Sequence, residues 1–414
     1  MARHGVVRHP ARGCSCPHPL FAGVDLLPVF LYVLALAVFA QGTSEFMLSG
    51  LVPGIARDLS VSVGAAASLT SAYAIGMIVG APVMAALSAR WPRRRALAAF
   101  LTAFVVVHVI GAVTTDFAVL FGTRIVAAIA NAGFLAVAMS VATALVPTAR
   151  HARATAVLLS GVTLSCVAGV PAGALLGEWS GWRSAFWAVA ALCLPALALV
   201  FRQAPADAAG REDVSIRREV RVVASRPVQW AMVLAAVVNG ATFATFAYLA
   251  VIATDITHLP DAAVPALLAA FGVGAFVGVT TAGRRADGGF GRGLLLALFT
   301  LPVGWALLAL ASPYTAPLFV ATILQGGLSF GIGSTLVTRV MHTAAQAPSL
   351  GGSFATVALN TGAFLGPLAA GVVTETTGDY RGAVWVSAAL AATAVGAVAA
   401  SRAWGARAGV EEAG

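Results

Sequence analysis

Twelve long apolar segments, separated by short polar turns, follow one another along the chain. They lie at approximately 28–52, 64–88, 96–114, 117–145, 154–177, 184–202, 228–252, 262–283, 293–311, 316–340, 352–373 and 382–401. Each is close to or above the roughly 18 to 20 apolar residues that cross a bilayer as a helix, whereas barrel strands alternate over about 10 residues. Because only helices and closed barrels satisfy the backbone in lipid, the pattern predicts an all-α membrane protein with twelve spans.

Composition and charge support a membrane protein. Hydrophobic residues make up 59% of the chain and charged residues 10%, and the mean hydropathy is +0.91. The net charge is +9, and all 25 basic residues are arginines, most of them in the turns between apolar segments. This distribution is the positive-inside pattern rather than a nucleic-acid-binding surface, so we expect no nucleic-acid partner.

The arginines also orient the chain. With the N-terminus in the cytoplasm, only Arg57, Arg183 and Arg381 fall on the outer side and Arg124 falls within a span, which leaves 21 of the 25 on the cytoplasmic side. The inverted topology would reverse this ratio. We therefore expect a multi-pass protein of the plasma membrane, with both termini cytoplasmic and the lipid bilayer as its surroundings.

Motifs for other functions are missing. A P-loop needs a lysine, and the chain has none, so ATP does not drive it directly. There is no HExxH motif, and His108 is interpreted as a packing residue. Cys166 and Cys193 lie inside apolar segments as small hydrophobic residues. We expect neither an enzyme nor a metal site or other cofactor, with the proton gradient as the source of energy.

The longest internal polar stretch, Arg202 to Pro227, divides the spans into six and six. Similar features recur about 198 residues apart: Trp182 and Arg183 correspond to Tyr380 and Arg381. Two related halves are the architecture of many secondary transporters. We predict a disordered cytoplasmic tail (1–27), a first six-helix bundle (28–203), a cytoplasmic linker (204–227), a second six-helix bundle (228–402) and a second cytoplasmic tail (403–414).

Two charged residues lie well inside predicted spans: Glu45 in the first and Arg124 in the fourth. Both are seven positions from the outer end of their span, which at about 1.5 Å per residue places them at a similar depth of roughly 10 Å. An ionisable group there costs several kcal/mol unless it is paired or faces water. We expect Glu45 to carry a coupling proton and Arg124 to tune it; the alternative is a static ion pair that locks two helices.

Uncharged polar and aromatic residues share faces of several spans and predict an amphipathic substrate cavity. Those selected are Gln41, Tyr73, Asn131, Asn239, Phe243, Phe246, Gln325, Asn360 and Phe364. For any single one of them, ordinary interhelical packing and hydrogen bonding is an equally good explanation. Glycines and prolines interrupt corresponding spans of the two halves and are predicted hinges. These are Gly161, Gly169, Pro171 and Gly173 in the fifth span and Gly366 and Pro367 in the eleventh.

From about residue 28 to 402 the chain resembles the major facilitator superfamily. The turn "AALSARWPRRRAL" is similar to that superfamily's G-x-L-a-D-R-x-G-R-R motif between spans two and three, although Ala89 replaces the aspartate. The corresponding turn of the second half is "GRRADGGFGR". In the superfamily this turn gates the cytoplasmic side, so the resemblance implies a gating role for Arg90, Arg93, Arg94, Asp287 and Arg292. Arg124 matches the arginine of the fourth-helix R-x-x-x-G motif.

The stretch "GVTLSCVAGVPAG" resembles the fifth-helix motif of the drug:proton antiporter branch, and the first two spans are similar to the chloramphenicol efflux proteins of actinobacteria. The resemblance implies a monomeric antiporter that exports a small lipophilic drug, most simply a phenicol, in exchange for protons. Alternatives stay open at this point: a proton-coupled exporter of sugars, nucleosides or another metabolite, or a passive facilitator of the same fold.

Overall fold

The computed structural model describes residues 28–88, 91–147, 150–203, 221–285, 292–347 and 350–411. The predicted tail 1–27, most of the predicted linker, and the gating residues Arg90 and Asp287 lie outside these ranges, as does the side chain of Arg292. Within them the structure contains twelve helices long and apolar enough to cross a membrane, so the predicted all-α class and the number of spans are confirmed.

The first bundle contains six spans, two of which are interrupted. Its elements are α1 (Val29–Phe46) with α2 (Leu48–Asp58), α3 (Val63–Ser88), α4 (Arg93–Val113), α5 (Phe117–Ala144), α6 (His151–Leu164) with η2 (Ser165–Gly169) and α7 (Val170–Ser180), and α8 (Arg183–Gln203). The first span breaks at Met47, and the fifth contains the π-helical turn η2. Local π-turns and breaks inside membrane helices are common where a site is built.

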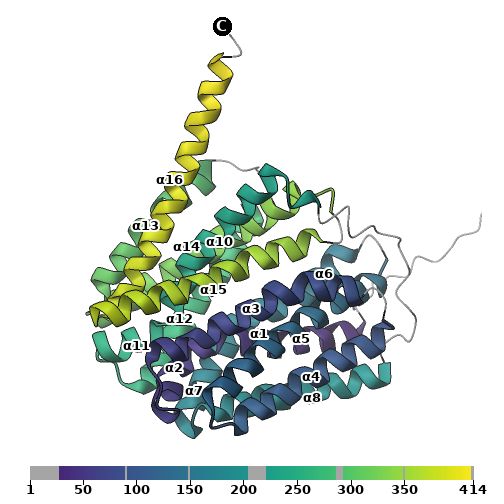
Figure 1. Ribbon diagram of the computed structural model, residues 1–414. Coiled ribbons are helices and arrows are strands. Elements are labelled where there is room, and N and C mark those ends of the chain that lie inside the picture. Colours follow the sequence, from purple (N-terminus) through teal and green to yellow (C-terminus); the bar gives the residue numbers. More distant parts are fainter. Residues whose placement is uncertain are drawn as a thin grey trace, which may run out of the picture.

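The second bundle repeats this arrangement. Its elements are α10 (Arg226–Phe246) with α11 (Leu249–Val251) and η3 (Ile252–Ile256), η4 (Asp261–Ala263), α12 (Val264–Arg285), α13 (Arg292–Ala311), α14 (Thr315–Thr343), α15 (Gly351–Thr377) and α16 (Arg381–Glu411). The long α16 projects beyond the other helices (Figure 1). Most of the predicted tail 403–414 therefore continues this helix instead of leaving it.

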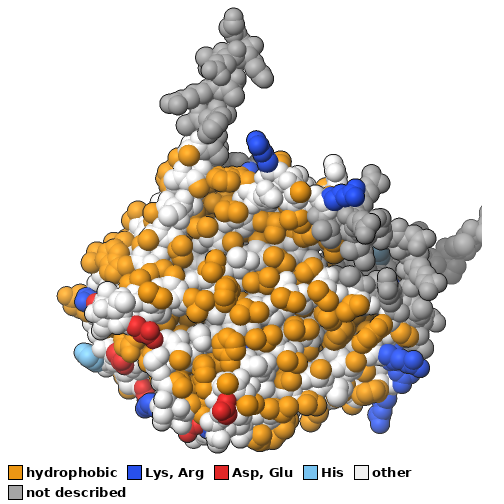
Figure 2. All heavy atoms as spheres, viewed as in Figure 1, with side chains coloured by type: hydrophobic (Ala, Val, Ile, Leu, Met, Phe, Trp, Pro, Cys, Tyr) orange, Lys and Arg blue, Asp and Glu red, His pale blue; other side chains and the backbone are white. Residues whose placement is uncertain are grey.

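The two ends of the molecule differ in charge. Besides Glu45, every acidic side chain that the structure describes lies near one end, which we call the acidic end: Asp58, Asp116, Glu178, Asp255, Asp261, Glu375 and Asp379. The opposite, arginine-rich end carries Arg93, Arg94, Arg95, Arg153, Arg202, Arg221, Arg226 and Arg284. Hydrophobic side chains cover the surface between the ends (Figure 2), as expected for a face in contact with lipid.

A charge contact fastens α2 to the loop before α8 at the acidic end. Asp58 accepts hydrogen bonds from Trp182 (3.0 Å) and from the Arg183 guanidinium, which also donates to the Thr114 carbonyl. The hydrogen bonds from Arg183 and then Trp182 hold the pKa of Asp58 below its usual value. In the second bundle, Arg381 binds Asp379 at 2.9 Å.

The two bundles touch along α3 and α15, and where α12 meets η2 and α7. At the acidic end, Ser62 donates to the Glu375 carboxylate at 3.0 Å, and Arg57 lies 3.9 Å from Asp261. The other half of the fifth span, α6, packs instead on α1 and α5 of its own bundle. Contacts across the interface of the fifth and eighth spans are therefore concentrated toward the acidic end.

Small residues allow the close helix contacts within the second bundle. Gly362 of α15 lies directly on the backbone of α10, where an added Cβ would collide with the Ala236 carbonyl and lie 2.6 Å from the Gly240 nitrogen. Such contacts replace the hydrophobic driving force that lipid removes. Neighbouring backbone cannot move aside as a flexible side chain can.

We therefore expect Gly362→Ala to destabilise the protein by about 1 to 3 kcal/mol, the usual cost of overpacking. The measurement is the apparent melting temperature of the purified protein in detergent. Gly352→Ala is the matched control, because it lies on the same helix and its Cβ would meet no atom within 4 Å. Equal melting temperatures for the two variants would contradict this account of the interface.

Candidate functional site

Glu45 lies in the last turn of α1, just before the chain breaks at Met47 and continues as α2. Its side chain is partly buried, in contrast to the exposed carboxylates of the acidic end. Because of this break, α1 ends one residue after Glu45, and the outer part of the first span continues as α2. Glu45 is the one acidic residue that the described parts of the chain place inside the bundle.

Arg124 of α5 is almost completely buried, with 1% of its surface exposed. Its guanidinium donates to Ser44 of α1 twice, to the hydroxyl at 2.8 Å and to the main-chain carbonyl at 2.6 Å. It also lies over the ring of Tyr73, 4.6 Å from the centroid, and within 5.8 Å of Phe186. A delocalised cation suits this combination of a bidentate contact and aromatic faces.

The static ion pair considered from the sequence is not formed. The charges of Glu45 and Arg124 interact electrostatically, but none of the ion pairs within the described ranges joins them at 4.0 Å or less. Arg124 is bound instead to the residue that precedes Glu45. The carboxylate is therefore left free to bind a proton while a fixed positive charge stays nearby.

His108 of α4, interpreted from the sequence as a packing residue, belongs to the same polar network. Its Nε2 lies 2.6 Å from the Ser44 hydroxyl and its Nδ1 lies 2.7 Å from the Phe104 carbonyl. Sequence spacing gave no sign of this contact, because Ser44 and His108 are distant in the chain and each looks like an isolated polar residue on an apolar helix.

Several buried polar atoms near Glu45 have no partner within the protein. They are both amide atoms of Gln41, the Tyr73 hydroxyl and Nε of Arg124. Buried polar groups are nearly always hydrogen-bonded, so a set of unpaired ones is available for hydrogen bonds to water or to another polar molecule. Asn131 makes only a weak contact, 3.8 Å from the Met77 sulfur. The predicted cavity residues of α1, α3 and α5 thus lie on mutually contacting helices.

Aromatic side chains connect this region to the second bundle. Phe46, the residue after Glu45, lies 6.1 Å from Phe243 of α10, which lies 5.9 Å from Phe246. Phe246 in turn lies 4.8 Å from Phe271 of α12. The structure therefore brings the two predicted cavity aromatics of α10 to the residue next to Glu45.

The other predicted cavity residues of the second bundle are engaged in helix packing. Asn239 donates to the Leu359 carbonyl at 2.7 Å and Asn360 to the Thr356 carbonyl at 3.0 Å. Gln325 donates to the Leu301 carbonyl of α13 at 3.0 Å. The Phe364 carbonyl accepts a hydrogen bond from Ser71 across the interface of the bundles. A role in the cavity stays a prediction for all four.

The predicted hinge glycines lie at close contacts. An added Cβ at Gly161 would collide with the first span, as it would at Gly169, where it meets Thr43, while at Gly173 it would lie 3.0 Å from Met47. Pro171 is the second residue of α7, which begins where η2 ends. In the second bundle, Gly366 and Pro367 lie inside an uninterrupted α15, where Gly366 contacts the backbone of α10. Bending at these positions stays a prediction.

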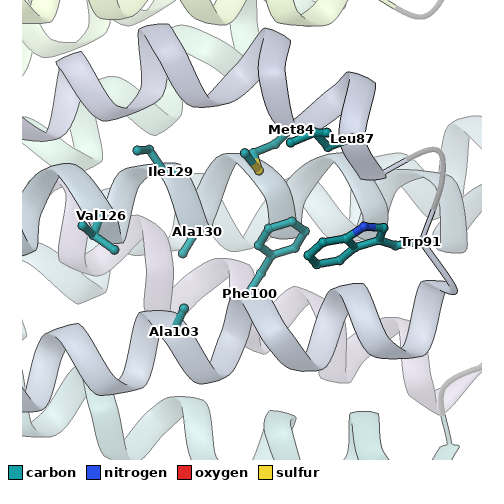
Figure 3. Close-up of a pocket in the computed structure, with 8 residues that line it drawn as sticks. All are labelled: Met84, Leu87, Trp91, Phe100, Ala103, Val126, Ile129 and Ala130. Atoms are coloured by element: carbon teal, nitrogen blue, oxygen red, sulfur yellow. The ribbon is translucent and has the colours of Figure 1, made fainter.

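Of the predicted gating arginines, the structure describes the side chains of Arg93 and Arg94, which begin α4 at the arginine-rich end, close to an apolar groove. Arg93 donates to Ser140 at 3.3 Å, and Arg94 is the next residue of α4. The groove has a volume of about 260 Å³ between α3, α4 and α5, and Trp91 and Phe100 stack there with ring centroids 6.0 Å apart (Figure 3). The residues that line the groove are apolar, and several of them are exposed on the surface of the molecule. The groove is therefore separate from the polar site around Glu45.

These features define a class of protein. In the described parts of the chain, twelve membrane spans lie in two groups of six. The one interior carboxylate of these parts, Glu45, lies near the buried Arg124 and next to Phe46, which contacts the aromatic residues of the second bundle. This is the construction of a secondary membrane transporter. Residues 34–354 match the family model of the Major Facilitator Superfamily, and the chain belongs to that superfamily.

The chain is similar to several curated transporters. It is 51% identical to a chloramphenicol resistance protein of Streptomyces lividans, over 89% of this chain and 95% of the relative. It is 34% identical to the inner membrane transport protein YdhP of Escherichia coli, over 83% of this chain and 88% of the relative. A chloramphenicol efflux pump of Mycobacterium tuberculosis is 29% identical, over 83% and 86% of the two chains.

Solved structures share the fold at low sequence identity. The nucleoside transporter NupG matches with a TM-score of 0.71 at 14% identity, over 90% of this chain and 99% of that one. A bacterial homologue of the lysosomal transporter Spinster, in an inward-facing conformation, matches with a TM-score of 0.68 at 16% identity, over 90% and 94% of the two chains. The division of the chain into two bundles, a linker and two tails stays a prediction.

Proposed function

We propose that this transporter is a proton-coupled antiporter that exports chloramphenicol or a related phenicol and so confers resistance. The proposed substrate rests on the 51% identity to the Streptomyces chloramphenicol resistance protein over most of both chains. We further propose that it acts as a monomer in the plasma membrane with both termini in the cytoplasm, as the arginine distribution favours.

The chemistry of the site supports a neutral aromatic substrate that carries hydroxyl and amide groups. Gln41 and Tyr73 have buried polar atoms without protein partners and can exchange hydrogen bonds with such groups. Phe46, Phe243 and Phe246 supply aromatic surface, because the ring centroid of Phe243 lies 6.1 Å from that of Phe46 and 5.9 Å from that of Phe246. The substrate would therefore bind where the polar cluster of the first bundle meets the aromatics of the second.

Proton coupling would use Glu45. In this role the carboxyl group takes up a proton from the outside, releases the drug there and gives the proton up to the cytoplasm after the bundles rock. Arg124 supports deprotonation because its positive charge favours the carboxylate. The contacts between the fifth and eighth spans, which are concentrated toward the acidic end, favour an arrangement closed to the outside, in which substrate enters from the arginine-rich end.

The first test of this function is expression in a drug-sensitive host. We expect resistance to rise several-fold for phenicols alone among a panel of antibiotics and to disappear with an uncoupler. Resistance that survives the uncoupler would contradict proton coupling. No resistance to any compound would overturn the proposed substrate and favour export of a sugar, nucleoside or other metabolite.

A matched pair of variants tests the substrate site. Gln41→Leu removes a buried amide without a protein partner, so we expect unchanged or higher thermal stability and roughly tenfold weaker phenicol binding, the effect of about one hydrogen bond. Gln325→Leu is the same chemical change, but it breaks the bond to Leu301 and is expected to lower stability instead. Calorimetry measures drug binding and the melting temperature measures stability, so together they distinguish the effects of the two variants. Unchanged binding by Gln41→Leu would contradict the site.

A further inference from the structure

When His108 is neutral, the hydrogen bonds through its ring have one consistent direction. The Phe104 carbonyl can only accept, so Nδ1 of His108 carries a hydrogen and donates it. Arg124 can only donate, so the Ser44 hydroxyl accepts from it with a lone pair. The hydroxyl then has its own hydrogen left for the remaining partner, Nε2 of His108.

This arrangement favours a neutral imidazole. A second hydrogen on Nε2 would leave the Ser44 hydroxyl hydrogen without its acceptor, and it would place a second positive charge beside the guanidinium. Two phenylalanines close the histidine off: its ring centroid lies 4.1 Å from that of Phe104 and 5.8 Å from that of Phe186. The side chain is 1% exposed. His108 is thus held as a hydrogen-bond acceptor toward Ser44.

We propose that His108 is a positioning residue for Arg124, which it keeps on Ser44 and away from Glu45 by accepting the Ser44 hydroxyl hydrogen. In this orientation a lone pair of the Ser44 oxygen faces α5 and accepts the hydrogen bond from Arg124. If the acceptor is removed, the hydroxyl rotates and the guanidinium keeps only the main-chain carbonyl of Ser44 as a fixed acceptor. The nearest anionic group is then the Glu45 carboxylate. This inference rests on the proposed role of Glu45 in proton coupling.

Other groups around Glu45 bear on the pH dependence. Tyr73 of α3, Arg124 of α5 and Cys166 of η2 interact electrostatically with Glu45, and His108 faces Arg124 from α4. Arg124 is the cation among these groups. A change in its position therefore acts on the carboxylate more directly than a change in the neutral groups.

Two histidine variants separate the contacts. His108→Asn retains a donor near the position of Nδ1 for the Phe104 carbonyl but has no group at the position of Nε2. His108→Gln does the reverse, because its terminal amide reaches the position of Nε2 and can accept from Ser44. Ser44→Ala removes the hydroxyl itself, and Ser44→Thr retains it. Ser387→Ala is the control, because it removes an equally short buried hydroxyl contact, 2.6 Å to Thr245, in the second bundle.

The experiment measures proton-driven phenicol export by the full chain in proteoliposomes across a range of pH. We expect His108→Asn and Ser44→Ala to move the half-maximal pH lower by about one unit, because a closer cation favours the carboxylate. His108→Gln, Ser44→Thr and Ser387→Ala should stay near the wild-type midpoint. A purely structural role would lower the active fraction without moving the midpoint.

The outcomes distinguish this inference from the proposed function. Wild-type midpoints for His108→Asn and Ser44→Ala overturn the role of His108, as does an equal shift in His108→Gln. If His108→Asn does not fold, Ser44→Ala decides, since it removes a single oxygen. Proton-driven export that persists in Glu45→Gln overturns the proposed function and this inference together, whereas loss of export in Glu45→Gln with unshifted His108 and Ser44 variants overturns this inference alone.

Discussion

Replacing Glu45 with glutamine is expected to reduce proton-driven drug export to the level of cells that lack the protein, while the amount of folded protein stays normal. The amide occupies the same space but cannot gain or lose a proton in this pH range. Because Glu45 makes no ion pair with Arg124 in the structure, the substitution breaks no direct contact that would hold α1 to α5. The measurement is drug export against a concentration gradient, with an imposed pH gradient, in vesicles.

Glu178→Gln is the matched control, because it is the same chemical change at an exposed carboxylate of the acidic end. It should export as the wild type does. Drug binding measured without a gradient should survive in Glu45→Gln, because the substitution removes coupling rather than the aromatic surface. Undiminished export against the gradient by Glu45→Gln would contradict the proposed mechanism. Loss of folded protein in this variant would indicate that Glu45 has a structural role instead.

The fold could be predicted from the sequence because lipid imposes a length. Each span must bury its backbone in its own helix and carry enough apolar residues to cross about 30 Å, and both requirements are visible in one dimension. The same argument identified Glu45 and Arg124, since an ionisable residue inside an apolar segment is rare for energetic reasons. The sequence could not show which residues would form hydrogen bonds or ion pairs with each charged group.

Partner choice depends on the rotation of each helix about its own axis. A stripe of polar residues identifies a face but not the helix that this face meets. Gln41 and Gln325 illustrate the difference, because both are buried amides on predicted cavity faces. The first has no partner in the protein, whereas the second binds the backbone of α13. His108 was missed for the same reason, since its partner Ser44 lies on another span.

Breaks within spans were also only partly visible. The glycines and Pro171 of the fifth span indicated an irregular helix, and the structure places the π-turn η2 among them. The break at Met47 was not predicted, although Gly42, Gly50 and Pro53 lie within six residues of it. These residues are also compatible with a continuous membrane helix, so they do not fix the position of a break.

The second large effect is expected at Arg124. Arg124→Gln removes two hydrogen bonds to Ser44 and the cation over Tyr73, so we expect a loss of roughly 3 to 5 kcal/mol, the range seen when one partner of a buried charged network is removed. Part of this cost would come from Glu45, whose carboxylate then lies in the bundle without a nearby positive charge. That part disappears if Glu45 is neutral as well.

A double-mutant cycle measures this shared part. The melting temperatures and denaturant midpoints of wild type, Glu45→Gln, Arg124→Gln and the double variant give the coupling between the two charges, which we expect at about 0.5 to 3 kcal/mol. The double variant should be more stable than Arg124→Gln alone yet export nothing against a gradient. Strict additivity would mean that Arg124 serves only to hold Ser44 and the aromatic rings, and Glu45 would then take up its proton without help from α5.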